Sequence, residues 1–533
     1  MLVKPTPEVP RRSWLAWAAF LVALYMAVGI GGWQRTLIPD EIRPLILAGR
    51  PLSEQMEYIR QDLIHPPLSF LLDRWWVLAF GDTDRAVKTL ALVQNLATLV
   101  LFTALASRIT ERWRLASFLF VVPFLRVGSS VNLVRMYGPL LLWSVAALWL
   151  WESWREKPTL IRLAAWTTAV SLALYTHISG FALLAVFFVV NWIYGPRRWA
   201  FTVATALAAL SFLPWVFYVA PVFLARGIEA NVAAIRKAPT FALLQVPFYF
   251  LSGEEPGASS PESLLHTSGL REPLKVAAVL LHLALVFLAG RKLLSLGLPR
   301  RNDPEAKRWL WVCAILVVLP VVCLYAFSVL RTPIIHPRYL LVTLPAYWLL
   351  IVMLGILAGR PGRILLFALF LPWTLASVGS ALVAQAKPSP ARVGTLYIQS
   401  VWRDSDLILC ERPMPMGYQV YWEWTRRLRH PGRFEVLTAN GLAYAKEILP
   451  GKKLAEIQLA GVERVWFFWG PTRDPLRVSA YLQDQGFVKN DLPELQIPTF
   501  LLFTRSNSAG LSPAPAPSGT APVRSMIRSK SLS

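Results

Sequence analysis

Two adjacent carboxylates, Asp40 and Glu41, stand shortly after the first long apolar stretch of the chain, residues 13–33. If that stretch crosses a membrane, both side chains lie at the membrane surface. A carboxylate at that place can take a proton from the hydroxyl group of an acceptor and so act as a general base. Solvated loop residues are the plainer alternative. Residue type and position together indicate Asp40 and Glu41 as candidate catalytic residues.

Imidazole, guanidinium and phenol groups recur near the ends of other apolar stretches. Arginine suits a phosphate oxygen better than any other side chain, because its planar fork offers several donors. Each group also has a simpler explanation, since a histidine can cap a chain corner or pack in a core, and an arginine can extend to lipid headgroups. The candidate substrate-binding residues are His65, Arg135, Tyr137, His177, His336, Arg338 and Tyr339.

Cofactor motifs are missing from the sequence. It contains no Walker loop, no GxGxxG after a strand, no HExxH and no CxxC pair. The histidine and acidic residues also lack the close spacing of metal ligands. We therefore predict no cofactor and no metal site, with a divalent cation as the alternative. Three cysteines are too few for a disulfide framework, and we expect Cys313, Cys323 and Cys410 to be buried.

The composition is that of a membrane protein. Hydrophobic residues make up 55% of the 533 residues, and the mean hydropathy is +0.47. Soluble domains contain about 45–50% apolar residues. The excess comes in blocks of roughly 17–25 residues, the length that crosses a bilayer. Candidate spans are 13–33, 86–106, 115–130, 137–153, 162–178, 179–194, 199–222, 273–289, 309–330, 339–358 and 364–385.

The segment 65–80 decides the predicted topology. It carries Asp73 and Arg74 beside paired tryptophans, a composition that favours an interfacial helix over a span. If it does not cross, the densely basic loops all face the cytoplasm, as the positive-inside rule requires. These loops are 107–114, 154–161, 195–198, 290–308 and 359–363. We therefore place the N-terminus inside and everything after residue 386 outside the plasma membrane.

The strong positive charge has the same explanation. The formal net charge is +23, from 54 basic and 31 acidic residues. Nucleic-acid binding would need a basic soluble domain studded with aromatic residues, and none accompanies the charge. Basic residues beside the apolar blocks account for it better, so we predict membrane lipids and no nucleic acid as partners.

The chain divides into three predicted parts. Residues 1–385 form a transmembrane domain, 386–505 a small soluble α/β domain, and 506–533 a disordered tail rich in Ser, Pro, Ala and Gly. Three runs in the α/β domain read as strands, and a segment ending at Gln485-Gly486 reads as a helix with a glycine stop. The strands are 407–410, 465–469 and 500–503, and the helix is 475–486.

Five stretches, in this order, resemble the GT-C superfamily of polytopic glycosyltransferases. They are Asp40-Glu41, His65-Pro-Pro-Leu68, Arg135-Met-Tyr137, Tyr175-Thr-His177, and Pro337-Arg-Tyr339-Leu-Leu with Leu344-Pro345 after it. The relatives include lipid A aminoarabinose transferases, protein O-mannosyltransferases and rhizobial core galacturonosyltransferases. The similarity covers roughly residues 13–360. The single motifs are short, and their order and common side of the membrane give the set its specificity.

The resemblance implies roles for individual residues. Asp40 matches the catalytic base of the family. Arg135, His336 and Arg338 match positions that hold the lipid phosphate, and His65 lies near them. Relatives often carry an acidic residue two positions before the motif arginine, where this chain has Leu133. A second acidic role, such as holding a metal, is therefore in doubt.

The expected fold is an α-helical integral membrane protein of about eleven transmembrane helices, with interfacial helices in the first outside loop and a small C-terminal α/β domain. Nucleotide sugars are absent outside the plasma membrane, so the expected donor is a polyprenyl-phosphate sugar. The expected activity moves a hexose or pentose to a hydroxyl of a lipid, glycan or protein, with inversion. A transporter or lipid flippase and an inactive homologue are the alternatives.

Overall fold

The structure is a computed structural model, and its contacts divide the chain into two compact units. The bundle unit comprises residues 1–34, 59–73 and 88–385, and the sheet unit comprises 35–58, 74–87 and 386–533. The residues that the structure describes are 11–34, 37–63, 65–125, 132–226, 246, 250, 271–295, 304–330, 336–384, 390–411, 416–437, 452–468, 476–490 and 500–506.

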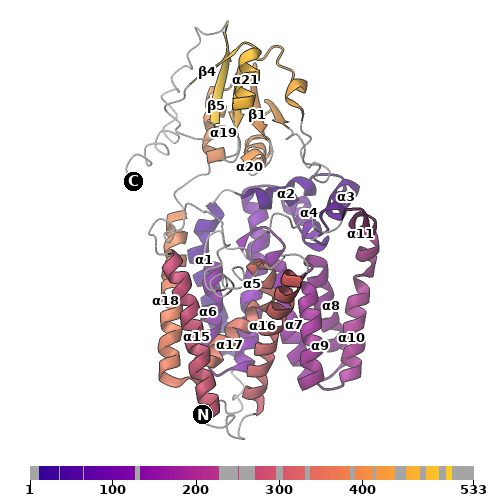
Figure 1. Ribbon diagram of the computed structural model, residues 1–533, viewed down its shortest axis with the longest axis vertical. Helices are drawn as coiled ribbons and strands as arrows, with labels where there is room; N and C mark the ends of the chain where they lie inside the picture. Colours follow the sequence, from indigo (N-terminus) through magenta and orange to yellow (C-terminus); the bar gives the residue numbers. More distant parts are fainter. Residues whose placement is uncertain are drawn as a thin grey trace. The chain divides into compact units, whose positions relative to one another are not determined.

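Helices make up the bundle unit (Figure 1). Those that lie wholly within it are α1 (Arg11–Gln34), α6 (Trp113–Leu125), α7 (Tyr137–Glu156), α8 (Leu160–Thr176), α9 (Gly180–Tyr194), α10 (Arg198–Ser211), α11 (Leu213–Arg226), α15 (Arg271–Ser295), α16 (Pro304–Leu330), the 3-10 helix η3 (Pro337–Thr343), α17 (Leu344–Leu357) and α18 (Gly359–Ala384). Three further helices contribute residues to both units: α3 (Leu52–Asp62), α4 (Leu68–Phe80) and α5 (Asp84–Ile109).

Several helices are long and apolar enough to cross a membrane. Among the described residues, Asp84–Ile109, Glu305–Leu330 and Arg338–Leu357 meet both criteria, with mean hydropathies of 1.8, 2.7 and 2.4. The predicted span 199–222 is a pair of helices, α10 and α11, bent by 43°. Shorter apolar helices, such as α8 and α9, coincide with other predicted spans. These helices support a membrane location, while the number of eleven spans stays a prediction.

The core of the bundle unit is dense in aromatic side chains. The rings of Phe102 on α5 and Phe120 on α6 stack with centroids 3.8 Å apart. Trp166 on α8 packs against Phe201 on α10 at 4.2 Å. Aromatic pairs of this kind add about 0.5–1.5 kcal/mol beyond the burial of their area. These contacts determine which helices are neighbours in the bundle.

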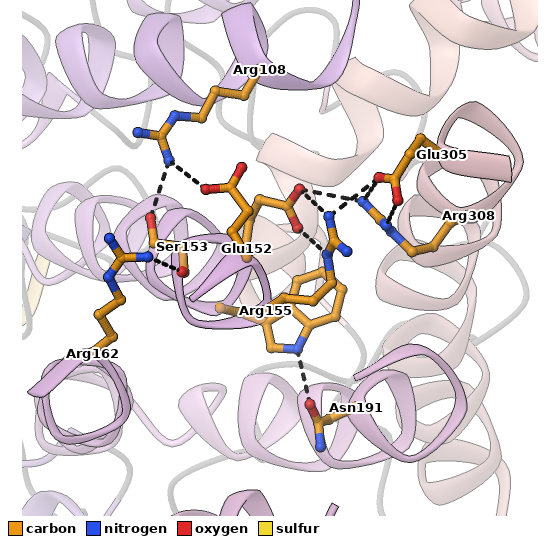
Figure 2. A network of polar contacts seen from close by, with 10 residues as sticks. Arg108, Glu152, Ser153, Arg155, Arg162, Asn191, Glu305 and Arg308 are labelled. Atoms are coloured by element: carbon orange, nitrogen blue, oxygen red, sulfur yellow. Dashed lines mark hydrogen bonds and ion pairs between the residues drawn. The ribbon is translucent and has the colours of Figure 1, made fainter. Parts of the chain in front are cut away.

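An ion-pair network joins α7 and α16 where α7 ends (Figure 2). Glu152 accepts hydrogen bonds from Arg155 at 2.7 and 2.9 Å and pairs with Arg308 at 3.3 Å. Glu305 pairs with both arginines, at 3.2 Å from Arg155. Glu152 and Arg308 are both buried. Removing one partner of a buried pair leaves an uncompensated charge. The network therefore stabilises the packing of α7 against α16.

The sheet unit contains a five-stranded sheet of order β2-β1-β3-β5-β4. Strands β1, β2 and β3 are parallel. Strand β5 runs antiparallel to β3, and β4 runs antiparallel to β5, so β4 has the same direction as the first three strands. The strands are β1 (Asp406–Glu411), β2 (Arg433–Leu437), β3 (Arg464–Phe468), β4 (Phe487–Asn490) and β5 (Phe500–Arg505). The remaining elements are α2 (Pro39–Ala48), α19 (Pro390–Val401), α20 (Met416–Tyr421), η4 (Trp422–Arg427), η5 (Leu454–Glu456) and α21 (Leu476–Asp484).

Three strands of the sheet and one helix match the sequence prediction. β1, β3 and β5 coincide with the predicted runs, because each is buried on both faces and reads as a continuous apolar segment. Gly486, with φ of +81°, follows α21 as the predicted stop. Cys410 on β1 and Cys313 on α16 are buried as expected, and burial raises the pKa of the Cys410 thiol. The expectation is wrong for Cys323, which is exposed on α16. The predicted tail lies outside the described residues after Ser506.

We predict that Glu152→Gln destabilises the bundle unit by about 3–5 kcal/mol, because Arg308 would keep a buried charge without its carboxylate. The measurement is the free energy of unfolding of the purified protein in detergent. Glu156→Gln is the matched control on the same helix. Its pair with Arg108 is exposed and 3.8 Å long, so we expect a loss of at most about 1 kcal/mol. Equal losses in the two variants would contradict a stabilising network.

Candidate functional site

His177 is the centre of the residues predicted to bind the substrate. It follows the last residue of α8, and its side chain is fully buried. Three rings surround it: His65 at 5.6 Å, Tyr137 at 6.0 Å and Tyr339 at 5.2 Å between ring centroids. These residues come from four separate places in the sequence, and the fold of the bundle unit brings them together.

A tight turn between α8 and α9 holds the His177 imidazole in place. The backbone N–H of His177 donates to the Ala173 carbonyl at 3.0 Å. Gly180 opens α9 so close to α8 that a Cβ atom there would lie 2.8 Å from the Ala173 backbone. The glycine is therefore required by the close approach of the two helices, and the turn leaves His177 little freedom.

The hydrogen bonds of His177 define its tautomer. Its Nδ1 accepts from the backbone N–H of Ser179 at 3.1 Å and lies 2.9 Å from the Ser179 hydroxyl. A backbone N–H can only donate, so in the neutral imidazole the proton is on Nε2. Nε2 is buried and has no hydrogen-bond partner among the described residues. Buried polar atoms without partners are rare in folded proteins, so this donor is suited to an acceptor oxygen of a ligand.

Arg338 lies between two of the tyrosines. Its guanidinium is 5.8 Å from the ring centroid of Tyr137 and 5.7 Å from that of Tyr339. Both rings can attract the cation through their π faces. The charges of Arg338 and Arg135 also act on the His177 imidazole. We call His65, Arg135, His177 and Arg338 the cation cluster, in which the two guanidinium groups act on the buried imidazole of His177.

His336 fixes the start of the helix that carries Arg338. Its Nδ1 accepts the backbone N–H of Arg338 at 3.4 Å and so caps η3, which has a proline at its first position. Its ring lies 5.8 Å from that of Tyr339. His336 is thus close to the cluster and orients the segment that supplies Arg338.

A polar triad precedes Arg135. Tyr25 donates its hydroxyl hydrogen to Asn132 Oδ1 at 2.9 Å, and Asn95 donates to the same oxygen at 3.0 Å. Asn132 in turn donates to the Phe124 carbonyl at 2.7 Å. The triad links α1, α5 and α6 to the segment that ends in Arg135. No sequence motif indicates this triad, because its members are 37 to 107 residues apart.

Two positions near the cluster, Leu133 and Asp62, bear on the acidic residues expected at the site. Leu133, which stands where relatives often carry an acidic residue, is buried. Asp62 is an acidic residue that the sequence analysis missed, and its Oδ1 lies 2.7 Å from His65 Nδ1. The spacing of three residues between them was the available signal. Asp62 orients the imidazole of His65 and compensates part of the positive charge.

An apolar groove lies beside the cluster on the bundle unit. Its volume is about 330 Å³, and it is bounded by α4, α8 and α10. Pro67 and Leu68, just after His65, line one wall, and Tyr175, two residues before His177, lines another. Tyr175 donates to the Ser211 carbonyl at 2.7 Å across the groove. The groove can accept a hydrocarbon chain, and its lining residues Pro67 and Tyr175 are each two positions from a histidine of the cluster in the sequence.

The two acidic candidates occupy the first turn of α2 in the sheet unit. Asp40 is partly exposed, whereas Glu41 is fully buried. Glu41 Oε2 accepts a hydrogen bond from the backbone N–H of Ile38 at 2.9 Å. This carboxylate therefore caps the N-terminus of α2, the helix to which Glu41 belongs. From the sequence, Asp40 and Glu41 are equivalent candidates. The structure distinguishes them, because Glu41 is buried in a helix cap and Asp40 is the more accessible carboxylate.

Helix α2 folds with the C-terminal part of the chain. Gln419 on α20 donates its amide to the Leu37 carbonyl at 3.1 Å, just before α2 begins. Arg74 on α4 donates to the Ala48 carbonyl at 3.1 Å, where α2 ends. Arg392 on α19 pairs with Asp84 at 2.8 Å. Parts of the first predicted outside loop therefore belong to the sheet unit, which sequence boundaries alone do not reveal.

The described residues contain no group of three or more His, Cys, Asp or Glu side chains arranged to hold a metal ion. In the cluster, His65 Nδ1 and His177 Nδ1 are both engaged, with Asp62 and Ser179 respectively. The arrangement suits an anion better than a cation.

Comparison with known proteins identifies the fold. No protein-family model matches the chain, and no curated protein matches its sequence. Among solved structures, the crystal structure of ArnT from Cupriavidus metallidurans bound to undecaprenyl phosphate is similar with a TM-score of 0.50 and 14% identity, covering 92% of this chain and 98% of ArnT. The apo structure of the same protein gives a TM-score of 0.45 and 14% identity, covering 93% and 100%.

The chain shares the fold of ArnT. ArnT is a lipid A aminoarabinose transferase of the GT-C superfamily, so the resemblance stated from five short motifs is confirmed at the level of the fold. The similarity extends over nearly the whole of both chains, well beyond the residues 13–360 on which the motifs lie.

We predict that Gln419→Leu loosens α2. The change removes the donor to the Leu37 carbonyl, and loss of such a bond typically costs about 1 kcal/mol. Amide hydrogen exchange over residues 37–45, measured by mass spectrometry, should therefore become about fivefold faster. Gln483→Leu, at an exposed position on α21, is the control and should leave this exchange unchanged. Unchanged exchange in Gln419→Leu would show that α20 does not hold α2.

Proposed function

We propose that this protein is a membrane glycosyltransferase that takes a sugar from a polyprenyl-phosphate donor and transfers it to a hydroxyl group of a lipid, glycan or protein. The observation that carries the proposal is the cation cluster around the unpartnered, buried Nε2 of His177. The fold shared with ArnT, whose structure was solved with undecaprenyl phosphate bound, supports the same class of donor.

The cluster and the groove suit the two ends of such a donor. The leaving phosphate gains negative charge as the bond to the sugar breaks, and cations already in place stabilise that charge without reorganisation. Arg338 and Arg135 supply the cations, and His177 supplies a hydrogen bond through Nε2. The apolar groove next to His65 accepts the beginning of the polyprenyl chain.

Asp40 is the proposed general base. It removes the proton from the acceptor hydroxyl, whose oxygen attacks the anomeric carbon while polyprenyl phosphate departs. A direct displacement of this kind inverts the anomeric centre. Glu41 is assigned to the cap of α2 and, by that contact, to the position of Asp40.

The proposed location is the outer face of the plasma membrane, with the N-terminus inside and the C-terminal residues outside. The density of basic residues in alternate predicted loops supports this orientation. A lipid-linked donor fits it, because nucleotide sugars are not available there. Mass spectrometry of the lipid-linked sugars that accumulate when the gene is deleted would identify the sugar.

We predict that Arg338→Ala weakens donor binding by about 2–5 kcal/mol, because it removes one partner of a desolvated charge pair. Arg338→Lys should restore only part of the affinity, since its point charge cannot contact two oxygens as a fork. The measurement is binding of polyprenyl phosphate by the purified protein. Arg60→Ala is the control, because Arg60 also lies over a tyrosine ring, that of Tyr218 at 5.3 Å. Equal affinity in Arg338→Ala and wild type would remove Arg338 from the site.

We predict that Asp40→Asn lowers the transfer rate by about 10²–10⁴-fold and leaves donor binding intact, because the change keeps the shape and removes the base. Transfer and binding are measured in parallel in nanodiscs. Glu41→Gln should lower the free energy of unfolding by about 1 kcal/mol through the weakened cap, with a smaller loss of rate. Wild-type transfer by Asp40→Asn would exclude Asp40 as the base, and a wild-type protein that binds donor without transferring sugar would favour a flippase or an inactive homologue.

A further inference from the structure

A second groove runs along α5, at the end of the bundle unit opposite to the cation cluster. It has a volume of about 530 Å³. Its floor is formed by residues of α5 that include Ala97, Ala104 and Arg108, and its walls carry Trp14 of α1 and Trp149 of α7. The opposite placement follows from α7, which begins at Tyr137 beside His177 and ends at Glu156 beside Arg108.

The groove exists because α5 has two different faces. One face packs into the core, where Phe102 stacks on Phe120. The groove residues Ala97, Val100, Ala104 and Arg108 follow one another at spacings of three or four residues, so they form one stripe on another face. Two of these residues are alanines, whose small side chains leave space for the groove. From Ala97 to Arg108 the helix rises about 17 Å, close to half of the roughly 30 Å hydrocarbon thickness of a bilayer.

Arg108 lies at one end of the groove. Arg108 donates through Nη1 to Ser153 Oγ at 3.2 Å and lies 3.8 Å from Glu156, and its guanidinium is 5.4 Å from the Trp149 ring. Both polar contacts use Nη1, which leaves Nε and Nη2 without a polar contact to the residues that the structure describes. Figure 2 shows Arg108 turned toward α7 in this way.

The second arginine is bound to the other wall. Arg114 donates through Nη2 to Ser13 Oγ at 3.2 Å, and Ser13 precedes the groove residue Trp14. Glu156 is the acidic neighbour, and its exposed pair with Arg108 is too weak to keep an anion away. The groove is thus lined by one guanidinium group and two indole rings, and Arg114 is bound to the residue next to Trp14.

We infer that this groove is a binding site for one anionic phospholipid of the leaflet opposite to the proposed donor. An acyl chain lies along the floor formed by α5, and the headgroup phosphate contacts Arg108. The length of the groove matches one leaflet. Trp14 and Trp149 lie at the level where tryptophan is enriched, between hydrocarbon and headgroups, and basic residues at that level attract anionic lipids. The site does not depend on the proposed transferase activity.

The test is native mass spectrometry of the detergent-purified protein, titrated with dioleoylphosphatidylglycerol or dioleoylphosphatidylcholine. The wild-type protein should retain one phosphatidylglycerol in preference to phosphatidylcholine. Arg108→Gln should lower retention of phosphatidylglycerol about fivefold, the contribution of one basic residue near an anionic surface, and leave phosphatidylcholine unchanged. Ala104→Phe, which fills the groove, should lower retention of both lipids.

Arg198→Gln is the matched control. Arg198 is exposed on α10, and its guanidinium lies 5.8 Å from the ring of Trp192, but it does not line the groove. It should retain both lipids as the wild-type protein does. Equal retention of the two lipids by the wild-type protein, or unchanged retention of phosphatidylglycerol in Arg108→Gln, would overturn the inference. If Ala104→Phe does not fold, Arg108→Gln alone decides the outcome.

Discussion

The cost of placing charge in hydrocarbon governs the arrangement of the bundle unit. An arginine or aspartate at the centre of a bilayer costs about 2.5–3.5 kcal/mol on insertion scales, so the charged side chains collect toward the two ends of the helices. Where charge is buried, it is paired. Glu152, for example, lies between Arg155 and Arg308.

The polar groups at the two ends of α7 have different hydrogen-bond partners. At the end of α7, each described arginine of the network has a carboxylate or carbonyl partner (Figure 2). At its start, the Nε2 of His177 is buried without a partner among the described residues. That buried donor favours the His177 end as the place where the phosphate of the proposed donor binds.

The sheet unit gives the first loop of the chain its structure. Helix α2 packs with α20 and receives bonds from Gln419 and Arg74. A short amphipathic helix such as α2 is marginal by itself, so the C-terminal residues stabilise the segment that carries Asp40. In this protein, therefore, changes in the C-terminal domain can affect the proposed base without touching any substrate.

The sequence by itself determined the membrane class, the approximate helix positions, three strands of the sheet and the set of polar residues at helix ends. Apolar length and strand-like runs are local properties, so they can be read without a fold. Only the tertiary structure decided which candidates meet: His65, Tyr137, His177 and Tyr339 gather, while Glu41 turns into a cap. It also decided that residues 35–58 fold with the C-terminal part. Such contacts join residues hundreds of positions apart, and no local pattern of residue types encodes which distant partner will satisfy a buried polar group.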